Sequence, residues 1–331
     1  MDREKLLADI PEHNRQNIEY YIQRLDKLGV PLIFDSEHLR RLIGINKNSF
    51  YTLIENMNLH YHSMLIPKKT GDYRIISKPS VNLKIIQRWI LDNILYTQHT
   101  HFASYGFEKN KSVKENAALH LNKKVVFSVD IEDFFTSIKE DDVLTIFQKL
   151  GYTEELSEIL KDLCCFNGFL PQGAPTSPYL SNLYCFELDK EMYELCRRNE
   201  LIYSRYADDI TMSGDNIDKD YILFQLKIIL DKYRFTLKHE KTHISYSGKR
   251  QLVTGILVND KLNVSKEYRN NLRQEMYYLN KYGIENHLEK REDIILKSNY
   301  KEHLYGKVNY LKMFDEEKAN KYLKILNAIN W

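Results

Sequence analysis

The sequence predicts an α+β protein, with strands gathered in the middle of the chain and helices on both sides. The clearest strand is Val125–Ile131, where Val, Phe, Val and Ile occupy every second position. A second strand signal runs through Leu201–Met212 and is interrupted by two adjacent aspartates, which is typical of a hairpin with an acidic tip. In residues 1–59 and 265–331 the apolar residues instead recur at helical spacing.

The overall composition is ordinary for a folded protein in water. Of the 331 residues, 43% are hydrophobic and 28% are charged, and no stretch reaches the roughly 18 apolar residues of a membrane span. The N-terminal segment is charged and lacks the apolar run of a signal peptide. The four cysteines form no C-x-x-C pair, so we interpret them as reduced core residues. These features predict a cytoplasmic protein with no membrane partner.

Charge is distributed unevenly along the chain, although its formal total is only +2. Residues 60–124 carry a net charge of +7 and residues 247–331 one of +5, whereas residues 125–246 carry −9. Two basic segments around an acidic one suit a protein that grips a polyanion on both sides of a metal-binding centre. Chance variation of charge along the chain is the alternative interpretation.

Residues 1–59 are expected to form a helical extension that contributes packing and no chemistry. Asp35 or Ser36 is suited to cap one of its helices, and Ser49 is suited to cap another.

A basic hairpin is predicted after this extension, with strands at Tyr61–Pro67 and Tyr73–Ile76. Lys68 in its turn and Arg74 on its second strand would lie close together. Such a pair can hold a triphosphate, since Arg offers a bidentate fork and Lys a point charge. A basic hairpin that only faces solvent is an equally good interpretation of this segment alone.

A short helix is predicted to begin near Ser112, the first residue of a capping-box pattern. It carries Asn116 and His120 one turn apart, on the same face. A histidine on a helix is more often structural than functional, so this pair by itself indicates no site.

Three aspartates lie at the ends of predicted strands. Asp130 lies at the C-terminal end of the clearest strand, on its more polar face. Asp208 and Asp209 repel each other at a hairpin tip, and a hard divalent cation would relieve that repulsion because Mg²⁺ prefers carboxylate oxygens. For the Asp-Asp dipeptide alone, a polar turn is the simpler explanation.

A rigid loop is predicted at residues 168–178, because its prolines and glycines forbid regular structure. Helices are expected before it, over about 141–166, and after it, from Tyr179 to Arg198. Free backbone N–H groups and Gln172 would suit this loop to lie beside a nucleotide. A plain connector is the alternative.

The last third of the chain continues with mixed signals. Lys241 lies in a segment of loop and strand, and strands at 251–258 and 261–264 are expected to form a hairpin. Beyond them, tyrosines alternate with basic residues over 265–331, which is typical of a nucleic-acid groove and also of an ordinary amphipathic bundle.

Together these segments resemble a reverse transcriptase, specifically the bacterial retron type. The resemblance extends from about residue 60 to residue 260 and keeps the order of the family's blocks. These blocks are the basic hairpin with Arg74, Ser104–Phe107, Asp130–Phe135, Leu170–Pro175, Tyr206–Asp209 and the segment around Lys241. Two further features resemble hallmarks of the retron branch, namely Asn116-Ala117 with His120, and Val253–Gly255.

The resemblance implies a right-hand polymerase fold with a helical N-terminal extension. The expected parts are the extension (1–59), the fingers (60–124), a palm with an antiparallel sheet (125–260, with a fingers insertion at about 137–175) and a helical thumb (261–331).

The resemblance also implies the roles of individual residues, with Asp208 as a principal metal ligand and Asp209 as its weaker helper. The catalytic and metal-binding residues would be Asp130, Ile131 through its backbone carbonyl, Asp208, Asp209 and Lys241, the last as the acid that protonates pyrophosphate. The dNTP-binding residues would be Lys68, Arg74, Phe135 as a gate against a 2′-hydroxyl, and Gln172. The residues expected to contact RNA are Asn116, His120, Val253, Thr254 and Gly255.

The implied activity is RNA-directed DNA synthesis from dNTPs with two Mg²⁺ ions. A retron enzyme primes from a 2′-hydroxyl within a cognate structured non-coding RNA and copies part of it into single-stranded DNA that stays joined to the RNA (msDNA). Such systems act in anti-phage defence, usually with an effector protein, which makes an effector a candidate partner. Two alternatives remain: another single-domain bacterial defence reverse transcriptase with different priming, and a non-catalytic RNA-binding scaffold that restrains an effector.

Overall fold

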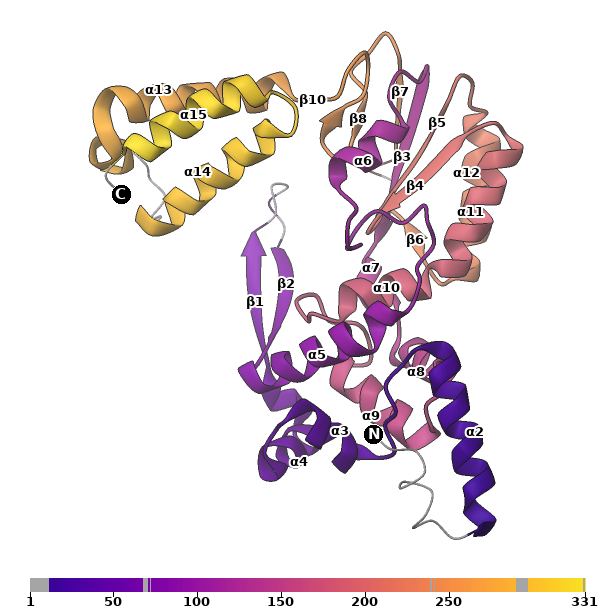
Figure 1. Cartoon of the computed structure of the whole chain (residues 1–331). Helices are drawn as coiled ribbons and strands as arrows, with labels where there is room; N and C mark the ends of the chain where they lie inside the picture. Colours follow the sequence, from indigo (N-terminus) through magenta and orange to yellow (C-terminus); the bar gives the residue numbers. More distant parts are fainter. Residues whose placement is uncertain are drawn as a thin grey trace.

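The computed structural model describes residues 12–67, 71, 73–238, 240, 242–289, 297–329 and 331 (Figure 1). The main core joins the N-terminal helices to the central sheet, since Leu25, Phe50 and Phe127 belong to one buried cluster. A second core holds the C-terminal helices together. The prediction of an α+β fold is confirmed.

The N-terminal helices pack on the body of the protein. They are α2 (Glu12–Leu28), α3 (Ser36–Ile43), α4 (Lys47–Glu55) and the 3-10 turn η1 (Met57–His60). As predicted, Asp35 caps α3, because its side chain accepts a hydrogen bond from the backbone N–H of His38 at 2.7 Å. The cap of α4 is Asn46 and not Ser49, so this helix begins earlier than predicted.

A two-stranded ribbon follows, in which β1 (Tyr61–Pro67) pairs with β2 (Tyr73–Pro79) and with no other strand of the described chain. The chain then continues through α5 (Val81–Asn93), the 3-10 turn η2 (Leu95–Thr97) and a loop to α6 (Val113–Leu119).

The central sheet is antiparallel, as predicted, with β3 between β5 on one side and both β6 and β7 on the other. Its strands are β3 (Val125–Glu132), β4 (Ile202–Tyr206), β5 (Asp209–Gly214), β6 (Thr236–Leu237) and β7 (His243–Tyr246). Neighbouring residues of β3 face opposite sides. Phe127 points into the main core, whereas Val126 packs with Ala117 of α6. Helix α6 therefore covers one face, and α11 (Phe186–Arg198) covers the other, next to α12 (Lys219–Lys232).

The segment between β3 and β4 is helical apart from the predicted rigid loop. Its helices are α7 (Phe134–Ser137), α8 (Glu140–Lys149), α9 (Glu154–Cys164), α10 (Ser177–Tyr184) and α11. The helix predicted over about 141–166 is broken at Gly151, where φ is 94°. The helix predicted up to Arg198 is broken at Cys185. All four cysteines are buried and free, as predicted.

A small sheet and a helical unit complete the chain. The sheet consists of β8 (Leu252–Val253), β9 (Ile256–Leu257) and β10 (Asn263–Val264), and the helices are α13 (Lys266–Glu289), α14 (Lys297–Lys312) and α15 (Glu316–Ala328). The prediction of one strand over 251–258 is wrong, because Thr254 and Gly255 form a tight turn with φ values of 47° and 83°.

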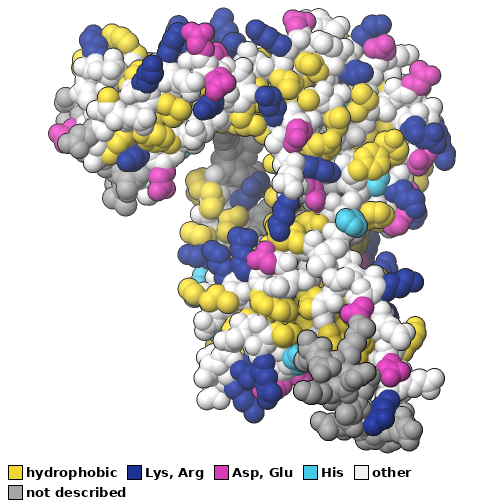
Figure 2. Space-filling model, in the orientation of Figure 1, with side chains coloured by type: hydrophobic (Ala, Val, Ile, Leu, Met, Phe, Trp, Pro, Cys, Tyr) yellow, Lys and Arg dark blue, Asp and Glu magenta, His cyan; other side chains and the backbone are white. Residues whose placement is uncertain are grey.

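The C-terminal helices overhang the β1–β2 ribbon (Figure 1). Figure 2 shows that the surface is hollowed between this helical unit and the body below it, with Lys and Arg side chains on both sides of the hollow. Within the described ranges, none of the helices combines the length and the apolar character that crossing a membrane requires.

Candidate active site

The register of the central sheet brings two of the predicted acidic ligands face to face. Asp130 of β3 pairs with Asp209 of β5. The backbone N–H of Ile131 donates to the carbonyl oxygen of Asp208 at 3.0 Å, which makes Asp130 and Asp209 a non-hydrogen-bonded pair. The Cα atoms of such a pair are about 4.5 Å apart, and the side chains lie on the same face. Two acidic side chains therefore start from neighbouring positions on one face of the sheet.

Asp208 occupies the turn between β4 and β5, directly before Asp209. The preceding residue, Ala207, has a φ of 57°, a left-handed conformation that is unfavourable for a residue with a side chain. Gly106, from the loop before α6, lies against this turn, because a Cβ atom built on it would be 2.5 Å from the backbone nitrogen of Ala207. The acidic turn is thus covered by a segment far away in the sequence.

The donor set of this turn fits a magnesium ion. Mg²⁺ usually takes one or two carboxylates and completes its shell with water and substrate phosphates, and the facing Asp130 and Asp209 supply such a pair, with Asp208 beside it. In the part of the chain that the structure describes, no three His, Cys, Asp or Glu side chains are gathered closely enough to enclose an ion. A pair of carboxylates suits a cation that completes its shell with water and substrate phosphates. The ranking of Asp208 above Asp209 and the use of the Ile131 carbonyl stay predictions.

A pocket of about 490 Å³ lies beside the predicted gate residue Phe135. Phe107 forms another wall, with its ring centroid 6.1 Å from that of Phe135. Residues 173–175 also line the pocket, and Lys84 and Arg88 of α5 supply positive charge. Aromatic walls with nearby cations suit a nucleotide, which offers a base to stack and phosphates to pair with. The role of Phe135 against a 2′-hydroxyl stays a prediction.

The Gln172 loop is fixed against the β1–β2 ribbon. The backbone N–H of Ser77 donates to the carbonyl oxygen of Gln172 at 2.7 Å. Gly173 approaches so closely that a Cβ atom there would be 2.7 Å from the Ser77 carbonyl oxygen and 3.1 Å from the side chain of Ile76. Arg74 and Ile76 are two residues apart on β2 and so face the same side. Arg74 therefore projects from the side of the ribbon that meets the Gln172 loop.

Lys68 and Lys241, which were predicted to bind phosphate and to protonate pyrophosphate, both lie outside the described residues. Lys241 is preceded by β6 and followed by β7, and both strands pair with β3. The backbone N–H of Lys238 also donates to the carbonyl oxygen of Asp130 at 2.9 Å. The chain on either side of Lys241 is therefore held next to the strand that carries Asp130.

Asn116 and His120 are buried, with 1% and 0% of their surface exposed, which corrects the prediction that their side chains contact RNA. The two ring nitrogens of His120 lie 2.6 Å and 2.8 Å from the hydroxyl oxygens of Ser213 and Ser204. Burial, with a smaller effect from the charge of Lys123, lowers the pKa of His120 to about 3, so the ring is neutral. His120 therefore joins the end of α6 to the sheet.

Lowering the pH from 7 to 5 is expected to reduce the free energy of unfolding by about 2 kcal/mol through His120 alone. Its pKa is depressed to about 3 in the folded protein, so the unfolded chain takes up the proton first. The stability is complete above about pH 6.5 and is lost as the pH falls toward 3. Urea unfolding of the wild type and His120→Gln at both pH values measures this effect, with the exposed His243→Gln as control. An equal pH dependence in the wild type and His120→Gln would rule out a buried neutral ring.

The Val253–Gly255 segment is only partly available to RNA. Val253 is fully buried in the small core beneath α6, which corrects its predicted RNA contact. Gly255 is exposed and Thr254 is half-buried. A contact with RNA through this turn therefore remains a prediction for Thr254 and Gly255.

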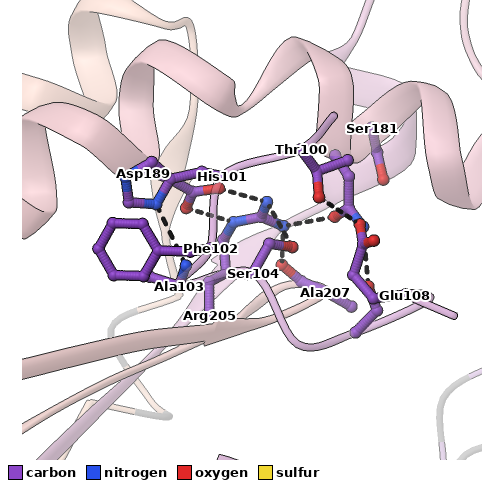
Figure 3. Close-up of polar contacts among 12 residues, drawn as sticks. Thr100, His101, Phe102, Ala103, Ser104, Glu108, Ser181, Asp189, Arg205 and Ala207 are labelled. Atoms are coloured by element: carbon purple, nitrogen blue, oxygen red, sulfur yellow. Dashed lines mark hydrogen bonds and ion pairs between the residues drawn. The ribbon is translucent and has the colours of Figure 1, made fainter. Parts of the chain in front are cut away.

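A buried ion pair behind the acidic turn was missed by the sequence predictions (Figure 3). Arg205 of β4 and Asp189 of α11 have no exposed side-chain surface, and the closest of their atoms are 2.7 Å apart. Asp189 lies on the otherwise apolar face of α11, next to Leu188 and one turn before Met192. A charged residue in such a place needs a buried partner. A charged residue on the apolar face of a predicted helix was therefore the sequence signal that could have revealed this ion pair.

The chain is similar to known reverse transcriptases over most of its length. A family model described as "Reverse transcriptase (RNA-dependent DNA polymerase)" matches residues 66–300. Retron Ec86 reverse transcriptase of Escherichia coli is 32% identical over 264 residues, which cover 77% of this chain and 81% of that protein.

Two relatives from Myxococcus xanthus are similar to the same degree. Retron Mx162 reverse transcriptase is 31% identical over 265 residues, which cover 70% of this chain and 54% of that protein. Retron Mx65 reverse transcriptase is 30% identical over 325 residues, which cover 90% of this chain and 72% of that protein. The chain therefore spans about half of the Mx162 protein and most of the other two.

Proposed function

The chain belongs to the retron-type reverse transcriptases and is an RNA-directed DNA polymerase with a right-hand polymerase fold, and we propose that it makes msDNA. In this proposal it primes from a 2′-hydroxyl of a cognate structured non-coding RNA and copies part of that RNA into single-stranded DNA that stays joined to it. The facing pair Asp130 and Asp209 beside Asp208 is the observation that supports DNA synthesis by this chain.

Reverse transcriptases use divalent metal ions, and the proposed ions here are two Mg²⁺ held by Asp130, Asp208 and Asp209 with help from the Ile131 carbonyl. Bound ions of this kind lower the pKa of the attacking hydroxyl and neutralise charge on the leaving phosphates. The task of the protein is to hold its carboxylates in place. The β3–β5 register does this for Asp130 and Asp209, and the bond from Ile131 does it for the backbone of Asp208.

The remaining predicted residues would handle the incoming nucleotide. Arg74 and Lys68 would pair with the triphosphate, and Gln172 would lie along the nucleotide, held by the contact of its loop with the ribbon. Lys241 would give a proton to the pyrophosphate as it leaves.

The substitution Phe135→Val is expected to lower the preference for dNTPs over rNTPs by about 10- to 100-fold. A smaller side chain in the wall of the 490 Å³ pocket would leave room for a 2′-hydroxyl. Single-nucleotide extension on a primed RNA template, with each nucleotide in turn, measures the ratio of kcat/KM values. Phe224→Val on the exposed surface of α12 is the control. Unchanged selectivity in Phe135→Val would remove the gate role from this residue.

Analysis of the nucleic acid that copurifies with the protein from its host tests the proposed function. We expect a single-stranded DNA that stays attached to RNA after deproteinisation and is released by RNase or a debranching enzyme. Free linear cDNA would instead indicate a defence reverse transcriptase with different priming. RNA without any DNA would indicate a binding scaffold. We further propose that the msDNA serves anti-phage defence together with an effector protein, in which case deletion of the gene should raise phage plating efficiency.

A further inference from the structure

Arg205 is the last residue but one of β4 and has no exposed surface, and its guanidinium uses all five of its N–H groups. Nε and Nη2 each donate to one carboxylate oxygen of Asp189 at 2.7 Å. Nη1 donates to the carbonyl oxygen of Ala207 at 3.0 Å and to Oδ1 of Asn182 at 3.2 Å. Nη2 also donates to Oγ of Ser104 at 3.2 Å (Figure 3). One side chain thus joins two helices, a loop and the acidic turn.

A buried ion pair contributes little net stability at such a position. Charges removed from water lose much of their hydration energy, and apolar side chains of similar volume often give a fold at least as stable. An apolar residue at position 205 could not, however, hold the carbonyl group of Ala207 or the hydroxyl group of Ser104. The geometry that Arg205 imposes therefore explains its presence better than stability does.

The bond to Ala207 fixes the peptide plane that leads into Asp208. The carbonyl group of Ala207 and the nitrogen of Asp208 belong to one planar unit, so holding the oxygen sets the direction in which the chain enters Asp208. On the other side, the Asp208 carbonyl oxygen accepts the hydrogen bond from Ile131 at 3.0 Å. The backbone of Asp208 is therefore fixed on its N-terminal side by Arg205 and on its C-terminal side by β3.

The same network holds the loop that covers the turn. The amide nitrogen of Asn182 donates to the carbonyl oxygen of Gly106 at 2.8 Å, and Gly106 lies against Ala207. The backbone N–H of Tyr105 donates to the carbonyl oxygen of Arg205 at 2.8 Å. The acidic turn and the loop that covers it are therefore held by the same hydrogen-bond network, and Arg205 bonds to both.

We infer that Arg205 is a positioning residue for the metal-binding turn. Through the Ala207 peptide it sets the orientation of Asp208 toward Asp130, and so the affinity of the site for its metal ions, without contact with metal or nucleotide. The inference rests on the proposed metal role of Asp208.

The substitution Arg205→Lys tests this inference. A lysine keeps the positive charge opposite Asp189 but has no planar fork with which to hold Ala207, Asn182 and Ser104 together. We expect kcat for RNA-templated DNA synthesis to fall on the order of 10- to 100-fold and the Mg²⁺ concentration for half-maximal activity to rise. The KM for dNTP should stay within about twofold, because the nucleotide contacts are elsewhere. Binding of Mn²⁺ to the protein without nucleotide, measured by electron paramagnetic resonance, should weaken in parallel.

Tyr203→Phe is the matched control, because it removes another buried hydrogen bond to Asp189, from the Tyr203 hydroxyl at 2.6 Å, and leaves the turn untouched. It should keep the wild-type Mg²⁺ and Mn²⁺ responses at temperatures well below its unfolding midpoint. If Arg205→Lys does not fold, Asn182→Ala provides a second test. It retains the Arg205–Asp189 ion pair and removes the hydrogen bonds that join Asn182 to Arg205 and to Gly106. It should shift the Mg²⁺ and Mn²⁺ responses in the same direction, to a smaller extent. A folded Arg205→Lys or Asn182→Ala variant with wild-type Mn²⁺ binding would overturn the inference.

Comparison of Asp208→Asn with Arg205→Lys distinguishes a wrong metal role of Asp208 from a wrong positioning role of Arg205. If Asp208→Asn retained both activity and Mn²⁺ binding, the metal role of Asp208 itself would be wrong. If Asp208→Asn were inactive while a folded Arg205→Lys behaved as wild type, only the positioning role would fail.

Discussion

Replacing Asp208 and Asp209 together by asparagine is expected to abolish DNA synthesis while RNA binding survives. Asparagine keeps the size of each side chain and removes the charge that a divalent cation requires. Because metal ions contribute several kcal/mol of transition-state stabilisation, the rate should fall by about a thousandfold or more. Extension of a primed RNA template with Mg²⁺ and dNTPs measures the activity, and a gel-shift assay measures the binding of RNA.

Asp220→Asn with Asp231→Asn is the matched control, since it makes the same change of charge on the exposed surface of α12. The control should extend the primer at the wild-type rate. Persistent extension by the Asp208→Asn, Asp209→Asn protein would show that the metal assignment is wrong. Single variants would then rank the two residues. The sequence resemblance favours Asp208 as the principal ligand, whereas the register places Asp209 opposite Asp130.

The acidic turn could be predicted from the sequence because its geometry is local. Apolar residues at every second position of Val125–Ile131 identified the strand and placed Asp130 on its more polar face. The strand signals around Asp208 and Asp209 predicted a hairpin with an acidic tip. That the two elements lie side by side was not local information, and only the resemblance, which implies an antiparallel palm sheet, indicated it; antiparallel pairing then leaves few arrangements. The observed register, with Asp130 opposite Asp209, is one of them.

The buried partners of the turn could not be predicted in the same way, because each contact joins distant segments. His120 meets Ser204 and Ser213, which are 84 and 93 residues further along the chain. One-dimensional spacing placed Asn116 and His120 on one helical face but could not tell whether that face meets RNA or the sheet. Their burial shows that it meets the sheet.

The predicted boundaries of helices and strands were wrong where a single residue adopts a left-handed conformation. Gly151 ends α8 with a φ of 94° and separates it from α9, although apolar spacing continues on both sides. Thr254, with a φ of 47°, starts the turn between β8 and β9. Threonine rarely adopts this conformation, so nothing in the local sequence beyond Gly255 marked the turn.

Gly106 illustrates a requirement that only the folded structure makes visible. Its backbone is not in the left-handed region, so no turn type demands a glycine there. The reason is contact: a Cβ atom would lie 2.5 Å from the nitrogen of Ala207 and 3.1 Å from the carbonyl carbon of Tyr206. Both are backbone atoms of the hairpin that carries Asp208, so they cannot move aside as a flexible side chain would. The added methyl group must displace either the covering loop or the turn.

The substitution Gly106→Ala is therefore expected to lower RNA-templated DNA synthesis on the order of 100-fold, because a shift of about 1 Å in a catalytic group costs that much. Gly306→Ala in α14 is the matched control, since a Cβ atom there meets nothing within 4 Å. Alanine within a helix should keep full activity and raise the free energy of unfolding by up to about 1 kcal/mol. Primer extension and urea unfolding of both variants measure the two effects. A folded Gly106→Ala protein with wild-type activity would mean that the loop can withdraw from the turn without moving Asp208.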